Sequence, residues 1–135
     1  MSLLNSLILK AKGPGRKVNE LQHSKGKPSF VLKIYEQLKE EILHKEPLIE
    51  IDSKVEYIAF KKNKKNIFDI KLLKSKVIMW VNKNRGELSE DLSALFVDCS
   101  NKGHHGNGDY EIHFKSLVDV EKFLMHNPIK KILEL

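Results

Sequence analysis

The stretch VEYIAFKKNKKNIFDIKLLKSKVIMWVN, residues 55–82, decides the fold class. Apolar residues recur at every second position in three runs, residues 55–61, 67–73 and 76–82, and this period is typical of β-strands. Only a few polar residues separate one run from the next. Because a parallel crossover needs a dozen or more residues, the stretch predicts an antiparallel meander.

The two faces of the third predicted strand differ in composition. Val77, Met79 and Val81 lie on one face, while Ile78 and Trp80 lie on the other. We expect the face with Val77 to look toward the core, and the face with Trp80 to look away from it.

An amphipathic helix is predicted before the meander, from about Pro28 to His44. Proline is well suited to a first helical turn, and Pro47 ends the pattern. The apolar residues of this segment follow one stripe with a period of 3.6 residues. They are Phe30, Val31, Ile34, Tyr35, Leu38, Ile42 and Leu43.

Shorter elements follow the meander. They are a short helix near residues 89–94, a strand over 95–100, a strand over 110–114, a helix from 117 to about 125 capped by Ser116, and a last helix over 129–135. The order of elements predicts an α+β fold. It consists of an antiparallel β-meander of about five strands, with an N-terminal amphipathic helix and C-terminal helices packed on one face.

The 135 residues fit one domain, and residues 1–27 are polar and basic after a Gly-Pro-Gly break. We therefore predict a lead-in or linker over 1–27 and a single α+β domain over 28–135. The lone Cys99 cannot form an intramolecular disulfide. No apolar run approaches the ~18 residues that span a bilayer, and no signal peptide is recognisable. We expect no membrane partner and a cytoplasmic location.

Positive charge is concentrated in the meander. The whole chain has a formal net charge of +6, from 24 Lys and Arg against 18 Asp and Glu. Residues 54–85 alone contain ten basic residues against Glu56 and Asp69, an excess of +8. Such an excess suits an anionic partner, nucleic acid above all.

The non-core face of the meander combines this charge with an aromatic side chain. Lysines around an exposed tryptophan suit stacking on bases and contact with phosphates. The predicted nucleic-acid contacts are Lys61, Lys71, Lys76, Trp80 and Arg85. The alternative is a solvated lysine-rich surface that protects the sheet edges, with Trp80 covered by a helix. A single arginine makes bidentate readout of bases a weaker expectation.

Residues 103–109 read Gly-His-His-Gly-Asn-Gly-Asp and are rich in glycine. Gly103, Gly106 and Gly108 indicate backbone that turns tightly or approaches other groups closely. The segment leads into a strand, lacks Gly-Lys-Ser/Thr and has no βαβ unit around it, so it is neither a P-loop nor a dinucleotide fingerprint. We therefore predict no cofactor. An anion nest and a tight connection between strands both remain open.

The histidines of this segment suggest acid–base chemistry. His104 is a candidate base, with Asp109 or Glu111 as its orienting carboxylate. No nucleophile is evident beside them, and a histidine that fixes the loop by hydrogen bonding is the simpler interpretation. Cys99 and His113 lie nearby, but no Cys-x-x-Cys or His-x-x-x-His pair is present. We predict no metal site, and the sequence favours a non-catalytic protein over an enzyme without deciding between them.

Several of these segments together resemble a known family. They are Tyr57-Ile58-Ala59-Phe60-Lys61, the run from Lys76 to Asn82, and Gly103-His104 with Gly106-Asn107-Gly108-Asp109-Tyr110-Glu111. From about Phe30 to Met125 the chain resembles an uncharacterised domain family sometimes labelled "predicted transport protein". That family tends to have an aromatic residue in place of His105, so His104 is the histidine that matches.

Members of that family often carry the domain C-terminal to a restriction-endonuclease-like domain. The resemblance therefore implies a non-catalytic accessory domain that binds nucleic acid, or a nuclease partner, through a basic sheet surface. The alternative is a small-ligand-binding or enzymatic domain with a pocket at Gly103–Asp109 that uses His104.

Overall fold

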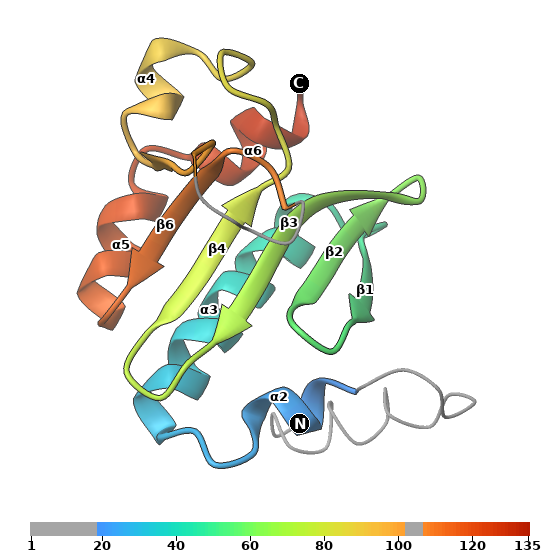
Figure 1. Ribbon diagram of the computed structural model, residues 1–135, viewed down its shortest axis with the longest axis vertical. Coiled ribbons are helices and arrows are strands. Elements are labelled where there is room, and N and C mark those ends of the chain that lie inside the picture. Colours follow the sequence, from blue (N-terminus) through green and yellow to red (C-terminus); the bar gives the residue numbers. More distant parts are fainter. Residues whose placement is uncertain (1–18, 102–106) are drawn as a thin grey trace.

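The computed structural model describes residues 19–101 and 107–135. They form an α+β fold in which helices pack against one six-stranded antiparallel sheet (Figure 1). The strand order is β1-β2-β3-β4-β6-β5. The predicted fold class is confirmed, and the described residues contain one strand more than expected.

The strands of the sheet are β1 (Glu50–Ser53), β2 (Ile58–Lys62), β3 (Lys65–Leu72), β4 (Val77–Val81), β5 (Val97–Asp98) and β6 (Tyr110–Phe114). The strand that the sequence analysis missed is β1, which pairs with β2 at the edge of the sheet. Its four residues include Glu50, Asp52 and Ser53, so they show no apolar alternation. Pairing with a neighbour, rather than local pattern, makes it a strand.

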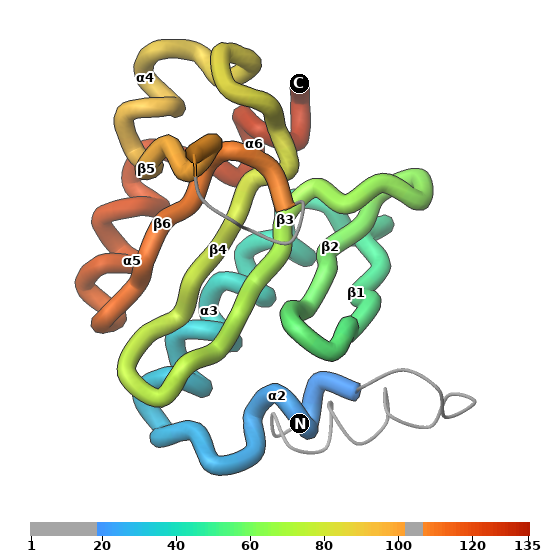
Figure 2. Tube along the Cα trace, in the orientation of Figure 1, coloured from blue at the N-terminus to red at the C-terminus, as the bar shows by residue number. Residues whose placement is uncertain are grey.

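The described helices are α2 (Glu20–Ser24), α3 (Ser29–Lys45), α4 (Glu90–Ser93), α5 (Leu117–Leu124) and α6 (Pro128–Leu133). Ser116 caps α5 by accepting a hydrogen bond from the Asp119 N–H, as predicted. Pro128 opens α6, whereas Pro28 stands just before α3 as its N-cap residue. Figure 2 shows α3 crossing behind the sheet, with α5 beside β6.

The core lies between α3, α5, α6 and one face of the sheet. The stripe predicted on α3 supplies Val31, Ile34, Leu38 and Ile42, all fully buried. One row across the sheet supplies Phe60, Phe68, Val81 and Tyr110, which are partners in successive strands. Burial of this apolar surface is the main favourable contribution to folding.

The β2–β3 hairpin is tighter than the predicted five-residue turn. Its two central residues, Asn63 and Lys64, both have positive φ, as in the turns that match the twist of paired strands. Lys65 and Asn66 therefore belong to β3. The hairpin places Lys64 and Lys65 on an exposed tip.

A β-bulge interrupts the same hairpin. Phe60 pairs with Phe68, but Lys61 pairs with Asn66, so Ile67 is an extra residue in β3. A bulge of this kind changes which side chains share a face of the strand. Here it puts Asn66 on the same face as Asp69, and a hydrogen bond joins the two side chains.

Helix α2 lies in the segment that the sequence analysis assigned to a lead-in. A capping box between Asn19 and Gln22 closes its first turn. The carboxylate of Glu20 is buried and accepts hydrogen bonds from the Tyr35 hydroxyl at 2.6 Å and from Lys39 Nζ at 2.8 Å. These contacts fix α2 on α3, and the sequence shows no short-range pattern that predicts them.

Replacement of Glu20 by alanine tests this attachment. Glu20→Ala leaves the Lys39 ammonium buried without its partner, which typically costs about 3 kcal/mol of unfolding free energy. We expect a lower Tm and a lower midpoint in urea. Glu40→Ala, at an exposed position of α3, is the control and should change stability by less than about 0.5 kcal/mol. Equal stability of the two variants would contradict the role given to Glu20.

Candidate functional site

The face of the sheet opposite α3 carries a row of residues paired across successive strands. The row runs through Asp52, Ala59, Asp69, Trp80, Glu111 and Val97. All of them except Val97 are buried. This row, which we call the open-face row, thus carries three carboxyl groups and an indole in sheltered surroundings.

The sequence predicted an exposed Trp80 surrounded by lysines, but Trp80 is buried in the structure. Its side chain is 6% exposed, so its ring has no free face for stacking on a base in this structure. The helix predicted as its alternative cover is not one of α3, α5 and α6, which pack on the other face.

The four basic residues predicted to contact nucleic acid each have a polar partner. The contacts are Lys61–Asp52 at 3.3 Å, Lys71–Glu56 at 3.7 Å, Arg85 Nε–Asp98 at 3.2 Å, and Lys76 Nζ–His113 Nδ1 at 3.0 Å. The Lys71–Glu56 and Arg85–Asp98 pairs are exposed, and such pairs contribute about 0–1 kcal/mol, so a phosphate can compete for these two cations. The strand register divides the four basic residues into two groups, with Lys61 and Arg85 toward the end of the sheet that holds the β2–β3 turn and Lys71 and Lys76 toward the end that holds the β3–β4 turn.

Asp69 is the centre of a polar cluster on the open-face row. Its carboxyl is fully buried and accepts hydrogen bonds from Asn66 Nδ2 and Asn82 Nδ2, both at 3.1 Å. Burial raises its pKa to about 7, although hydrogen bonds from neighbouring carboxamides and the charge of Lys61 oppose the shift. Desolvation prevails because a carboxylate loses more solvation than neutral donors restore.

Asn107 completes this cluster from the segment before β6. Its carboxamide is buried and close enough to lower the pKa of Asp69, yet neither of its polar atoms has a well-formed hydrogen bond. A carboxyl that titrates near pH 7 has a pKa suited to proton transfer. A substrate has no direct access to it, because Asp69 is fully buried. In the sequence, the only sign of this cluster is the presence of three asparagines and one aspartate. The bulge in β3 and the segment that leads into β6 bring them together.

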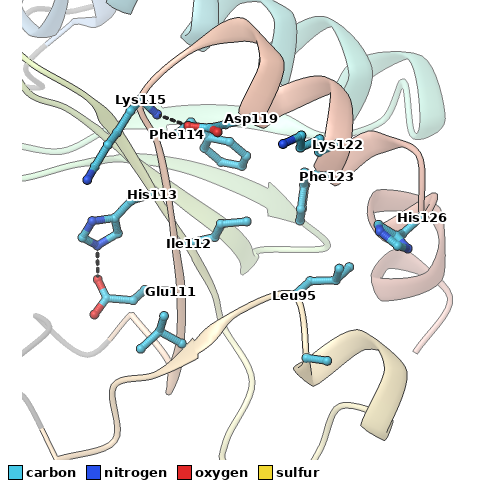
Figure 3. A pocket seen from close by; sticks show the side chains of 12 residues that line it. Leu95, Glu111, Ile112, His113, Phe114, Lys115, Asp119, Lys122, Phe123 and His126 are labelled. Atoms are coloured by element: carbon cyan, nitrogen blue, oxygen red, sulfur yellow. Dashed lines mark hydrogen bonds and ion pairs between the residues drawn. The ribbon is translucent and has the colours of Figure 1, made fainter.

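Glu111, a predicted partner of His104, is paired with His113, while His104 itself lies outside the described residues. Glu111 Oε2 lies 2.9 Å from His113 Nε2, and His113 Nδ1 lies 3.0 Å from Lys76 Nζ. A carboxylate and an ammonium therefore orient the ring from its two sides, as Figure 3 shows for the Glu111 side. The signal for this pair was the i, i+2 spacing, which places both residues on one face of a strand.

A groove of about 680 Å³ runs along the outer edge of β6 (Figure 3). It exists because β5 pairs only with Tyr110 and Glu111, which leaves the rest of that edge uncovered by a described strand. Leu95, Ile112 and Phe123 line it together with charged side chains from β6 and α5. The groove is open and mostly apolar, and the Glu111–His113 pair stands at its side.

The glycine-rich segment is described only in part, since Gly103, His104 and Gly106 lie outside the described residues. Gly108 has φ +92°, and a Cβ there would lie 2.2 Å from the Val81 carbonyl oxygen. Asp109 donates its N–H to the Lys83 carbonyl at 2.9 Å, and its Oδ2 accepts the Arg85 N–H at 2.7 Å. Both residues therefore fasten the start of β6 to the end of β4.

Neither a metal centre nor a membrane span is found in the part of the chain that the structure describes. No three His, Cys, Asp or Glu side chains there gather closely enough to hold a metal ion. Cys99 is buried, with its Sγ 3.6 Å from the Gly108 carbonyl oxygen. No helix of residues 19–101 and 107–135 has the length and apolarity needed to cross a bilayer.

A family model described as a domain of unknown function, DUF5655, matches residues 20–125. The chain belongs to the DUF5655 family. It is 43% identical over 102 residues to an uncharacterised protein of Haemophilus influenzae strain Rd, a region that covers 76% of this chain and 33% of that protein. The chain thus spans about a third of the length of that relative. No solved structure matches the chain.

The limits of the DUF5655 match coincide with structural features. The match begins at Glu20, whose carboxylate attaches α2 to α3, and ends at Met125, the C-cap of α5. The resemblance drawn from sequence began about ten residues later, at Phe30. The family domain therefore includes α2.

Gly108→Ala tests the close approach between β6 and β4. The added Cβ would collide with backbone atoms of Val81 and Asn82, at a position that already has positive φ. We expect a loss of about 3 kcal/mol or more in unfolding free energy, measured in urea. Gly86→Ala is the matched control, because Gly86 has φ +90° but nothing lies within 4 Å of its Cβ position. It should cost only about 1 kcal/mol, and equal losses would refute the steric explanation.

Asp69→Asn tests the raised pKa of the buried carboxyl. The folded-state pKa of about 7 exceeds the ordinary value of 3.8, so between these values the folded protein keeps a proton that the unfolded chain releases. The unfolding free energy of the wild type should therefore fall with rising pH, by up to about 1.4 kcal/mol per unit relative to Asp69→Asn. Urea unfolding of both proteins from pH 4 to 8 measures the difference. Parallel curves would show that Asp69 does not titrate in this range.

Proposed function

We propose that this DUF5655 domain binds nucleic acid by contact between its lysines and the phosphate backbone. The observation that best supports this proposal is that the lysines of residues 54–85 outnumber the carboxylates available to them. Within the described residues, no ion pair is formed by Lys64, Lys65, Lys74 or Lys83.

The paired lysines are also incompletely neutralised. Lys54 and Lys61 share the single carboxylate of Asp52, at 2.9 Å and 3.3 Å. Asp69, which is one of only two acidic residues in the stretch, has a pKa of about 7 and so carries less than a full charge near neutral pH. The local excess of positive charge therefore survives the ion pairs, which supports attraction of a polyanion.

The tip of the β2–β3 hairpin is the strongest part of this proposed interface. Lys64 and Lys65 are exposed there, and the hairpin between β2 and β3 extends beyond the neighbouring strands (Figure 2). Their ammonium groups form no ion pair with a described residue, so no such pair has to break before they contact a phosphate. A protruding two-stranded hairpin also approaches a nucleic-acid backbone without steric hindrance from the rest of the domain.

The burial of Trp80 changes the mode of binding that the sequence suggested. Without an exposed ring, and with one arginine in the stretch, base stacking and bidentate base contacts contribute little. Contacts to phosphate are insensitive to sequence and weaken as salt rises. We therefore propose binding that is non-specific in sequence and strongly dependent on salt.

An accessory role agrees with the size of the chain. It spans about a third of the Haemophilus influenzae relative, so in that protein the matched region is part of a longer chain. The family resemblance associates such domains with restriction-endonuclease-like domains. A weak backbone-binding module would raise the local concentration of nucleic acid for a neighbouring domain.

Fluorescence anisotropy with single- and double-stranded DNA and RNA tests this proposal. We expect a Kd of about 1–100 µM near physiological salt, with little difference between sequences. Lys64→Gln combined with Lys65→Gln should weaken binding and reduce the slope of log K against log salt by about 1–2.

The control variant combines Lys130→Gln with Lys131→Gln on α6, which packs with the helices on the other side of the sheet. It removes the same charge and should leave the affinity within about twofold of the wild type. Absence of binding at low salt, or equal loss in both double variants, would overturn the proposed interface.

A further inference from the structure

A small polar hollow lies at the end of the sheet opposite the β2–β3 hairpin tip. Its volume is about 330 Å³. Three segments that are distant in sequence form its wall, namely α2 with the residues after it, the β1–β2 turn, and the end of β3 with the β3–β4 turn. The lining residues are Gln22, His23, Lys27, Val55, Glu56, Lys71, Leu72, Leu73 and Lys74. We call this the α2 hollow.

The charges that line the α2 hollow are mostly positive. Lys27, Lys71 and Lys74 face a single carboxylate, Glu56. Glu56 lies 3.7 Å from Lys71 Nζ, which is a long and partly exposed contact. Lys27 and Lys74 form no ion pair with any described residue. The hollow therefore has an excess of two positive charges and two ammonium groups free to bind an anion.

His23 adds an imidazole in a fixed orientation. Its Nε2 lies 2.7 Å from the Lys54 carbonyl oxygen, which can only accept, so Nε2 carries a hydrogen. Burial lowers the pKa of His23, and the charges of Lys27 and Lys71 lower it further, against the Lys54 carbonyl and Glu20, which raise it. The fields of two lysines from different segments thus converge on one ring.

These features match the chemistry of a phosphate group. Three ammonium groups around a concave polar surface can neutralise a dianion and donate to several of its oxygens at once. The volume exceeds that of one phosphate and leaves room for part of the molecule that carries it. Helix α2 and the residues after it bring His23 and Lys27 to the site. The buried contacts of Glu20, which hold α2 against α3, therefore also position these two side chains.

We propose that the α2 hollow binds a phosphate group through Lys27, Lys71 and Lys74, with His23 at its wall. The site goes beyond the backbone-binding surface proposed above, because a single small anion is sufficient to occupy it. The phosphate belongs either to the end of a nucleic acid or to a small phosphorylated molecule. Both sources present the same dianionic group, and the experiment below distinguishes them.

Titration of the isotope-labelled full chain with inorganic phosphate, followed by NMR, tests the site. Sodium chloride at matched ionic strength is the reference. We expect saturable shifts of the His23 ring and of Lys71–Lys74 amides, with a Kd tighter than about 1 mM. Bound phosphate should also raise the His23 pKa by about half a unit or more, since a dianion opposes the effect of Lys27 and Lys71.

Two matched double variants locate the effect. Lys27→Gln combined with Lys74→Gln should abolish the phosphate-dependent shift of His23, while Lys64→Gln combined with Lys65→Gln should leave it unchanged. Both variants remove two lysines that form no ion pair with a described residue, so they lower the net charge of the protein equally. Equal responses of the two variants, or identical His23 titrations in phosphate and chloride, would overturn the proposal.

Competition against inorganic phosphate identifies the source. Displacement by a 5′-phosphorylated oligonucleotide, but not by its 5′-hydroxyl counterpart, supports a nucleic-acid end. Displacement by ribose 5-phosphate but by neither oligonucleotide supports a small phosphorylated molecule as the source of the phosphate. Failure of every phosphorylated probe to displace phosphate would overturn the site. The proposed backbone binding is judged separately by the Lys64 and Lys65 variant, so either proposal can fail while the other holds.

Discussion

The packing of α3 across one face of the sheet is the constraint on which the rest of the structure depends. Its fully buried stripe covers the row of Phe60, Phe68, Val81 and Tyr110, and α5 and α6 extend the same layer. One layer of helices is enough for 135 residues, because a chain of this length builds a single core. The opposite face carries carboxyl and carboxamide groups beside Ala59 and Trp80. The candidate sites lie on that face, at the ends of the sheet or, for the groove, along the outer edge of β6.

Hydrogen bonds between polar side chains, rather than apolar packing, organise the centre of the open face. Its central residue is a buried carboxyl, Asp69, kept in place by the carboxamides of Asn66 and Asn82 rather than by a cation at close range. The bulge at Ile67 brings one of these carboxamides to the site, and the end of β4 brings the other. This cluster links β3, β4 and the connection to β6, while Gly108 allows that connection to approach β4. The sheltered polar row thus has a structural explanation, and the charges at the ends of the sheet are the groups accessible to a partner.

The two ends of the sheet offer different chemistry to an anion. The β2–β3 tip presents exposed lysines on a protruding hairpin, which suits a long and uniform backbone. The α2 hollow gathers lysines from separate segments around one histidine, which suits one compact group. A domain that carries both would hold a polyanion loosely along one edge and a phosphate group in a defined place. In the Haemophilus influenzae relative, the region similar to this chain makes up 33% of a longer protein.

The sequence by itself determined the strands β2, β3, β4 and β6, the helix α3 and the cap of α5, because their signals are local. Alternation, helical periodicity and capping residues depend on neighbours a few positions away. Only the tertiary structure decided the fate of Trp80, the pairing of Glu111 with His113, the raised pKa of Asp69 and the existence of α2 and β1. The burial of Trp80, the pKa of Asp69 and the attachment of α2 depend on contacts between segments that are distant in sequence, or on burial that such contacts create. β1 is a strand because it pairs with β2, and Glu111 meets His113 because the two share one face of β6. The glycine-rich stretch shows both sides: its composition indicated a close approach, and the fold identified the carbonyl of Val81 as the group approached.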